Sequence, residues 1–275
     1  MHNSKSVISS KENNLLKRIR QLQQAGSKGQ KARQESQLAV MDGIHLLQVW
    51  QGDPRLQSIL ITPAALTNAE IAAIIDSHCE QCPEVEIQLV EEALWPSISE
   101  LERAPQIMGL VRLEFPKNTS KNLRGDTIIL DAIQDAGNVG TILRTALACH
   151  FNQIVCTAGT AHIWSPKVLR AAMGAHRYLT FYEGQSIDDV TSNIEAPLLA
   201  TTMTAEHSLY SIEARLQKSV AWVFGNEGQG VSPGLLGQAT LIRVPQNPKL
   251  ESLNVASTAA VCLYETLRAR GQFNS

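Results

Sequence analysis

The feature of this chain that most limits its possible folds is the alternation of short apolar runs with segments of helical periodicity. Beyond residue 126, apolar runs have the length and composition of strands, and helical segments separate most of them. These runs are residues 127–133, 153–158, 178–183, 197–203, 219–225 and 240–245. Strands that alternate with helices are typical of parallel sheets, so we expect an α/β domain with a mainly parallel sheet covered on both faces.

A smaller series of the same kind lies nearer the N-terminus. Residues 13–24 have helical periodicity that residues 25–30 break, and residues 37–53 read as a strand, a turn at Asp42 and Gly43, and a helix. The other elements expected here are a capped helix over 67–78 and strands over 56–62, 85–91 and 107–114. We therefore predict a small α/β domain over residues 1–114, a polar linker over 115–125, and a larger α/β domain over 126–275.

The composition is that of a globular protein with a core, because 44% of the 275 residues are hydrophobic and 18% are charged. No apolar run approaches the roughly 18 residues that a membrane span needs. The first fourteen residues contain no apolar segment, which argues against a secretory signal. We expect a cytoplasmic protein.

The five cysteines, an odd number, indicate no disulfide framework and fit a reducing compartment. Cys79 and Cys82 form a single C-x-x-C pair without two further ligands at close spacing. We interpret this pair as part of a loop rather than as a zinc site, and we predict no metal. Cys149, Cys156 and Cys262 lie in apolar runs and are expected to be buried.

The charge is distributed unevenly along the chain. The net charge is −2, but residues 1–33 carry eight Lys and Arg residues against one Glu. Such an excess suits an arm or a face that meets nucleic-acid phosphates, because counterion release supplies affinity independent of sequence. A solvated basic helix explains the charge equally well, so the charge alone leaves both interpretations open.

Residues 138–151 are the first of three segments with candidate functional residues. A helix over this segment has an apolar side and a second side that carries Asn138, Thr141, Arg144 and Thr145. The helix follows a strand, and ligands of open α/β sheets bind at the carboxyl ends of strands. Asn138 and Arg144 are therefore candidates for a ligand site, although an exposed capping Asn and a solvated Arg would give the same pattern.

The second segment is a glycine-rich turn after the apolar run that ends at residue 225. Gly225, Gly228 and Gly230 let the backbone approach a ligand closely or adopt positive φ, and Glu227 lies among them. The glycine spacing differs from the dinucleotide fingerprint, and the Lys of a phosphate-binding loop is absent. Alone, this segment indicates only a turn.

The third segment is a loop that leads into a long final helix, predicted to begin near Ser252. Ser252 and Asn254 lie where the free N–H groups of the first helical turn point, and capping by Ser252 is the simplest interpretation. A stripe that suits a close helix–helix or dimer contact follows, at Ala256, Ala260, Leu263 and Leu267.

In this order and spacing, the three segments resemble the three motifs of the SpoU (TrmH) family of RNA ribose 2′-O-methyltransferases, within the SPOUT group. The resemblance covers residues 126–270, including 165–175, and extends more loosely over the family's substrate-binding domain at 13–113. The combination of G-N-E-G-x-G with S-L-N-V-A and L-Y-E is very specific. This chain departs from the family at Ala136, His150, Met173 and Gln246, none of which is usually given a catalytic role.

The resemblance implies a C-terminal domain with a deep trefoil knot, which is an exception to the rule against knots. It implies that S-adenosylmethionine binds in the knot, held largely by backbone groups, and that the final helix forms a homodimer. The implied cofactor-binding residues are Thr202, Gly225, Val244 and Leu253. The implied catalytic residues are Asn138, Arg144, Glu227, Ser252 and Asn254.

The predicted reaction is methyl transfer to a ribose 2′-hydroxyl of structured RNA, with ribosomal RNA favoured over transfer RNA. The hydroxyl is a poor nucleophile, so the reaction needs alignment and help in removing the proton. The family assigns this task to Arg144, but an arginine stays protonated. We therefore interpret Arg144 as binding phosphate or stabilising the forming alkoxide, and we leave the base open.

Two other classes of function are weighed against this reaction. A non-catalytic RNA-binding protein descended from a methyltransferase would be expected to lose the motif side chains. The five implied catalytic side chains are all present in this sequence. A methyltransferase for a small molecule or a protein fits the basic N-terminal region poorly.

Overall fold

The computed structural model describes residues 7–101, 105–114 and 122–272. The chain forms two compact units. Unit 1 comprises Met1–Glu114 together with Trp164–Gly174, and unit 2 comprises Phe115–Ile163 together with Ala175–Ser275. Most of the predicted linker, residues 115–121, lies outside the described residues, whereas Leu123 is buried and its backbone pairs with Asn193 and Glu195 of unit 2.

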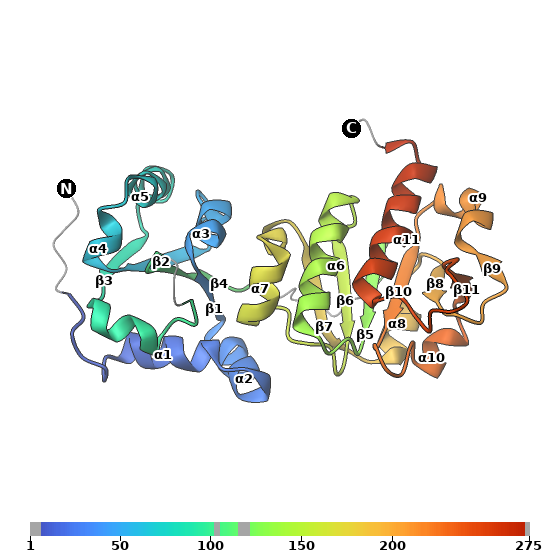
Figure 1. Ribbon diagram of the computed structural model, residues 1–275, viewed down its shortest axis with the longest axis horizontal. Helices are drawn as coiled ribbons and strands as arrows, with labels where there is room; N and C mark the ends of the chain where they lie inside the picture. The colour runs from blue at the N-terminus through green and yellow to red at the C-terminus, as the bar shows by residue number, and fades with distance from the viewer. Residues whose placement is uncertain (1–6, 102–104, 115–121, 273–275) are drawn as a thin grey trace. The chain divides into compact units, whose positions relative to one another are not determined.

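Unit 1 is built on a four-stranded mixed sheet (Figure 1). Its strands are β1 (Leu38–Asp42), β2 (Leu56–Ile61), β3 (Glu86–Leu89) and β4 (Ile107–Arg112), in the order β1-β4-β2-β3. Its helices are α1 (Asn14–Gln23), α2 (Gly26–Ser36), α3 (Ile44–Trp50), α4 (Pro63–Leu66), α5 (Ala69–Gln81), the 3₁₀ helix η1 (Glu92–Ser97) and α7 (Pro166–Ala172). The four strands predicted from the sequence are present, and β4 pairs antiparallel with β1 and β2.

Two local predictions in unit 1 are wrong. Residues 25–30 are expected only to break the helical pattern. Instead α2 begins at Gly26, with only Gln24 and Ala25 between the two helices. Cys79 lies inside α5 and Cys82 is its C-cap, so this pair ends a helix rather than forming a loop.

The segment that contains α7 packs with unit 1, although unit 2 precedes and follows it in the chain. Helix α7 contacts β1 and buries Val168, Leu169 and Ala172. The guanidinium of Arg170 donates to Glu100 over 3.0 Å. The resemblance includes residues 165–175, and within that stretch residues up to Gly174 pack with unit 1 whereas Ala175 belongs to unit 2.

Unit 2 contains a seven-stranded sheet in the order β7-β6-β5-β10-β8-β11-β9, and every neighbouring pair is parallel. The strands are β5 (Thr127–Asp131), β6 (Gln153–Thr157), β7 (Thr180–Gln185), β8 (Leu198–Thr201), β9 (His207–Ser208), β10 (Ala221–Gly225) and β11 (Thr240–Arg243). The helices are α6 (Ala136–Ala148), η2 (Ala175–Arg177), α8 (Ile187–Asn193), η3 (Leu209–Ser211), α9 (Glu213–Leu216), α10 (Pro233–Leu236) and α11 (Val255–Ala269). The predicted parallel sheet is confirmed.

Helices cover both faces of this sheet, as the apolar runs indicated. On one face, Val190 of α8 and Leu235 of α10 pack in a cluster with Val223 of β10. On the other face, α11 packs beside α6, and the indole N–H of Trp222 donates to Thr266 of α11 over 3.0 Å. Strands β5 and β10 lie at the centre and are buried along their whole length, which is why they are apolar throughout.

The small-residue stripe of α11 faces the interior of unit 2. Ala256, Leu263 and Leu267 are at most 6% exposed, because they pack against the protein's own core, and the fourth residue of the stripe, Ala260, is half-buried. The helix–helix contact predicted for this stripe is confirmed, because α11 packs beside α6, and the dimer contact stays a prediction. The apolar residues that α11 exposes are Val261 and Tyr264, on another side of the helix.

Within the described ranges, no helix has the length and apolar character to cross a membrane. The buried state predicted for Cys149, Cys156 and Cys262 is confirmed.

Candidate active site

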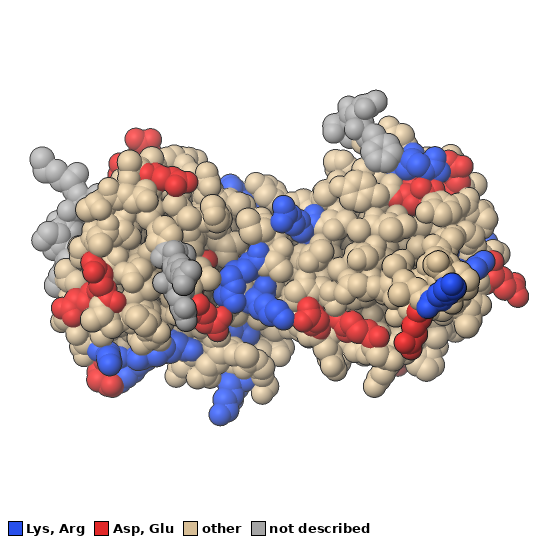
Figure 2. All heavy atoms as spheres, in the orientation of Figure 1, with Lys and Arg blue, Asp and Glu red and all other residues tan. Residues whose placement is uncertain are grey.

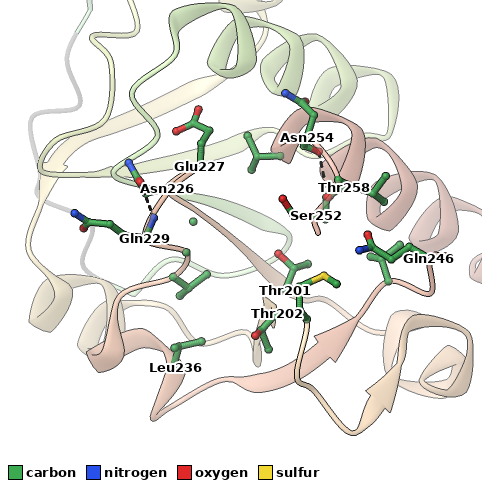
Figure 3. Close-up of a pocket in the computed structure, with 17 residues that line it drawn as sticks. Thr201, Thr202, Asn226, Glu227, Gln229, Leu236, Gln246, Ser252, Asn254 and Thr258 are labelled. Atoms are coloured by element: carbon green, nitrogen blue, oxygen red, sulfur yellow. Dashed lines mark hydrogen bonds between the residues drawn. The ribbon is translucent and has the colours of Figure 1, made fainter. Parts of the chain in front are cut away.

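A pocket of about 430 Å³ opens where three neighbouring strands of unit 2 end (Figure 3). Its lining comes from the residues after β8, from the glycine-rich loop after β10, and from the chain between β11 and α11. Figure 3 shows Asn226 and Glu227 on one side, with Ser252 and Asn254 across from them near the start of α11. The pocket thus lies at the carboxyl edge of a parallel sheet, where such folds bind ligands.

The four residues predicted to bind a cofactor all line this pocket. They are Thr202, Gly225, Val244 and Leu253, and they come from three separate segments of the sequence. Sequence reasoning missed other lining residues, among them Met203, Leu236 and Thr258. Thr258 could have been found, because it lies one helical turn after Asn254 and its hydroxyl donates to the Asn254 carbonyl.

The glycine-rich loop folds back tightly on itself after β10. The backbones of Asn226 and Gly230 exchange two hydrogen bonds, of 2.9 and 2.8 Å. A Cβ atom on Gly225 would lie 2.3 Å from the Gly230 carbonyl carbon and 2.4 Å from the Val231 nitrogen. Position 225 therefore requires glycine because no side chain fits between the two ends of the loop.

Side chains also hold this loop against the end of β5. The Asn226 amide donates to the carbonyl of Ala132 over 2.8 Å. The buried carboxylate of Asp131 accepts a hydrogen bond from the Ser232 backbone over 2.6 Å and one from the Thr157 hydroxyl over 2.9 Å. These bonds fix the position of the loop that forms one wall of the pocket.

Three of the five predicted catalytic residues form one hydrogen-bonded chain beside the pocket. The Asn138 amide donates to Glu227 over 3.0 Å, and the Asn254 amide donates to the Asn138 side-chain oxygen over 3.0 Å. Asp135 caps α6 through the Asn138 N–H, so Asn138 lies in the first turn of α6. These hydrogen bonds link the three segments that the sequence identified, because each segment contributes one of the three residues.

The predicted cap of the final helix is wrong by two residues. Asn254, not Ser252, is the N-cap of α11, and its side-chain oxygen accepts from the N–H groups of Ala256 and Ser257. Asn254 therefore uses its oxygen for the helix and its amide for Asn138. Capping fixes the direction in which the amide points.

The hydrogen bonds around Glu227 lower the pKa of its carboxyl below the ordinary value. Partial burial alone would raise the pKa. The opposing hydrogen bonds from the Asn138 side chain and from backbone N–H groups, including those of Gln134 and Asp135, favour the ionised form and together outweigh the burial. Glu227 is therefore an acceptor at neutral pH.

Ser252 and Arg144 are placed differently from the other three predicted catalytic residues. Ser252 lines the pocket and is exposed. Arg144 lies on the exposed side of α6, is not among the lining residues, and has no hydrogen bond or ion pair within the described ranges. An exposed, unpaired guanidinium of this kind is available to an anion from solution.

Among the residues that the structure describes, no group of three His, Cys, Asp or Glu side chains is arranged to hold a metal ion. The site offers amide, carboxylate and hydroxyl groups, with the guanidinium of Arg144 nearby on α6.

Comparisons with known proteins agree with this geometry. The SpoU rRNA methylase family model matches residues 126–264. A tRNA/rRNA methyltransferase from Synechocystis, described as uncharacterized, is 34% identical over 95% of this chain and 93% of its own length. The 23S rRNA (guanosine-2′-O)-methyltransferase RlmP from Bacillus subtilis is 30% identical over 66% of this chain and 72% of its own length.

A solved structure shows that the fold is shared along nearly the whole chain. The AdoMet-bound rRNA methyltransferase from Sinorhizobium meliloti matches with a TM-score of 0.78 and 22% identity, over 96% of this chain and 97% of that one. The family model covers half of this chain, and the Synechocystis relative covers nearly all of it. The chain therefore belongs to the SpoU rRNA methylase family and is a methyltransferase, as the three segments predicted.

Proposed function

We propose that this protein transfers a methyl group from S-adenosylmethionine to a ribose 2′-hydroxyl of structured RNA, with ribosomal RNA favoured over transfer RNA. The observation that carries the proposal is the hydrogen-bonded chain of Glu227, Asn138 and Asn254 beside the pocket. Family membership and the 2′-O-methyltransferase named among its relatives support the choice of reaction.

The pocket fits the proposed cofactor in size and in chemistry. Its volume of about 430 Å³ is typical of small-molecule sites. Apolar side chains of Leu236, Val244 and Leu253 offer contact area for a base, and the adjacent loops offer polar groups. When bound, the cofactor supplies an electrophilic methyl on a sulfonium.

The side chains around the pocket would orient the second reactant. Asn138 and Asn254 hold one another, so neither amide is free to rotate away from the pocket edge. Ser252 offers a hydroxyl inside the pocket. Arg144, free on α6, would bind an RNA phosphate or stabilise the oxyanion as it forms, because its charge persists at neutral pH.

We propose a deep trefoil knot in unit 2, in which the chain after β11 passes through an earlier loop. The parallel sheet order and the use of residues 244–255 beside the glycine-rich loop support this proposal. We further propose that residues 1–114 form the RNA substrate-binding domain, with residues 126–275 as the methyltransferase domain.

We propose that the protein acts as a homodimer through α11. Because the small-residue stripe is buried, the surface for the partner is the side that carries Val261 and Tyr264, which are 36% and 46% exposed. A cytoplasmic location stays a prediction.

The test of the proposed function uses RNA from a strain that lacks the protein. Purified protein and radiolabelled S-adenosylmethionine should label this RNA, and the label should lie on a nucleotide whose 3′ linkage resists alkaline hydrolysis. Ribosomal RNA should be labelled more strongly than transfer RNA. Label on the base, on protein only, or on nothing would contradict the proposal.

A further inference from the structure

A second groove, remote in sequence from the active-site pocket, lies between α1 and α2 of unit 1. Two residues explain why these helices pack so closely. A Cβ atom on Gly29 would lie 1.7 Å from the carbonyl oxygen of Gln24, so only glycine lets α2 approach the end of α1. The buried guanidinium of Arg33 donates to the carbonyls of Leu22 and Gln24 at that end.

Several basic residues of α1 and α2 are already bonded within the protein, so fewer of them are available to bind phosphate than the sequence count indicates. Arg33 is 1% exposed and satisfies the last carbonyls of α1, so it is structural. The Arg20 guanidinium bonds to the carbonyl of Lys11, and Lys17 is paired with Glu12 over 2.6 Å.

The remaining basic residues of the two helices line the groove. Arg18, Lys28 and Lys31 lie around a volume of about 440 Å³, together with the polar side chains of Gln21 and Gln24. Arg18 and Lys28 have no hydrogen bond or ion pair within the described ranges. Lys31 has only a 3.7 Å contact with Glu35, and both of these side chains are more than 60% exposed.

The start of α2 is arranged unfavourably for an isolated helix. Its N-cap, Ala25, provides no side-chain hydrogen bond, and its first turn contains Lys28 but no acidic residue. The partial positive charge at a helix N-terminus repels a lysine and attracts an anion. A phosphate bound at this end would interact favourably with both Lys28 and the helix N-terminus, and so would offset their repulsion.

The rest of unit 1 is acidic, which directs a polyanion to this groove. Residues 34–114 and 164–174 together carry thirteen Asp and Glu residues against five Lys and Arg residues. Figure 2 shows Lys and Arg side chains along the edge that α1 and α2 form and a second group where Figure 1 places α7, with acidic side chains over other parts of the unit. The net negative charge of the rest of unit 1 therefore favours the α1–α2 edge over the acidic parts of the unit as the place where a polynucleotide binds.

We infer that the α1–α2 groove binds the phosphodiester backbone of the RNA substrate, through Arg18, Lys28 and Lys31. This inference rests on the proposed function, since it takes RNA as the partner. The groove reads charge rather than sequence, because its free donors are a guanidinium and ammonium groups on flexible stems. It positions the RNA and takes no part in methyl transfer.

The test is a salt series of binding measurements with ribosomal RNA from a strain that lacks the protein. The double variant Arg18→Gln with Lys28→Gln should raise the Kd roughly tenfold at about 0.1 M salt and flatten the slope of log affinity against log salt by roughly 1.5 units. The matched control is Arg215→Gln with Lys218→Gln, which removes the same charges from exposed positions of unit 2. The control should match the unchanged chain.

A third variant tests the sign of the effect. Glu35→Gln removes the carboxylate that lines the groove, so it should lower the Kd by about twofold. All variants should bind S-adenosylmethionine normally and melt at no markedly lower temperature than the unchanged chain, because the altered side chains are exposed and the charge of Lys28 is unfavourable at the start of α2.

The outcomes separate the two proposals. If the unchanged chain methylates RNA while the double variant keeps its affinity and salt slope, the groove is a solvated surface and only the present inference fails. If the unchanged chain neither binds nor methylates any RNA, the proposed function itself fails. Loss of affinity in the control pair as great as in the double variant would also overturn the inference.

Discussion

The side-chain amide of Asn254 donates a hydrogen bond to the side-chain oxygen of Asn138 over 3.0 Å, although 116 positions separate the two residues in the chain. Asn138 in turn donates to Glu227. Asn138→Ala should lower turnover roughly tenfold, because it removes both bonds. Thr141→Ala is the matched control, since the Thr141 hydroxyl donates to the Gly137 carbonyl within the same helix and contacts neither Glu227 nor Asn254 in the described hydrogen bonds. Equal activity of the two variants in a methyl-transfer assay would exclude Asn138 from the site.

Arg144→Ala should reduce methyl transfer by about a hundredfold while the Kd for S-adenosylmethionine stays unchanged, because the residue lies outside the pocket lining and its proposed partner is the RNA. Arg124→Ala removes an exposed arginine that is paired with Glu195 and should be nearly neutral. Single-turnover rates and calorimetric cofactor binding check the two halves of this prediction. Near-normal turnover of the Arg144 variant would remove that residue from the mechanism.

Gly225→Ala should weaken cofactor binding by about tenfold or more, since overpacking of this kind costs about 1–3 kcal/mol. The added Cβ would meet the backbone of Gly230 and Val231 within 2.4 Å and displace the loop. At Gly237 the nearest atom is 3.5 Å away, so Gly237→Ala should bind the cofactor normally. Calorimetric titration of both variants measures the difference, and unchanged affinity at position 225 would show that the loop can move without loss.

Glu227 should contribute to stability in a pH-dependent way. Its folded-state pKa is lowered, so its contribution is present above the ordinary value of 4.5 and is lost as the pH falls through the folded-state pKa. The stability gap between the unchanged chain and Glu227→Gln should therefore be constant near neutral pH and shrink in acid. Denaturant unfolding across a pH series tests this sign, with Glu251→Gln as an exposed control. A gap that widens in acid would contradict it.

Tyr264→Glu should convert the proposed dimer to a monomer, because it places a charge on the exposed apolar side of α11, where burial against a partner is costly. Tyr210→Glu changes another exposed tyrosine, 60% accessible, and should leave the dimer intact. Sedimentation velocity distinguishes the two states. A Tyr264 variant that remains fully dimeric would place the contact on another surface.

The strands and the grouping of the three motif segments could be predicted because both depend on local patterns. Buried parallel strands are apolar throughout, and β5 and β10 follow this rule. Local patterns also indicated that Asn138, Glu227 and Asn254 belong to one site, through the resemblance that they share.

Other features depend on contacts that no local pattern records. Helical periodicity defined the stripe at Ala256 and Leu263, but it cannot say whether that side faces the protein's own core or a partner. Helix α2 has poor helix formers at its start, and its packing depends on Gly29 and Arg33 meeting the end of α1. The choice of Asn254 over Ser252 as cap depends on the path of the preceding loop.

The packing of α7 has a consequence for how the protein is made. As the chain leaves the ribosome, the first 114 residues emerge without the helix that buries Val168 and Leu169 against β1. Helix α7, the last element of unit 1 in the sequence, is synthesised only after β5, α6 and β6 of unit 2. Domains generally fold in the order of their synthesis, but here one helix of the first unit is synthesised only after the second unit has begun. A nascent chain halted before residue 164 would hold an unfinished N-terminal unit.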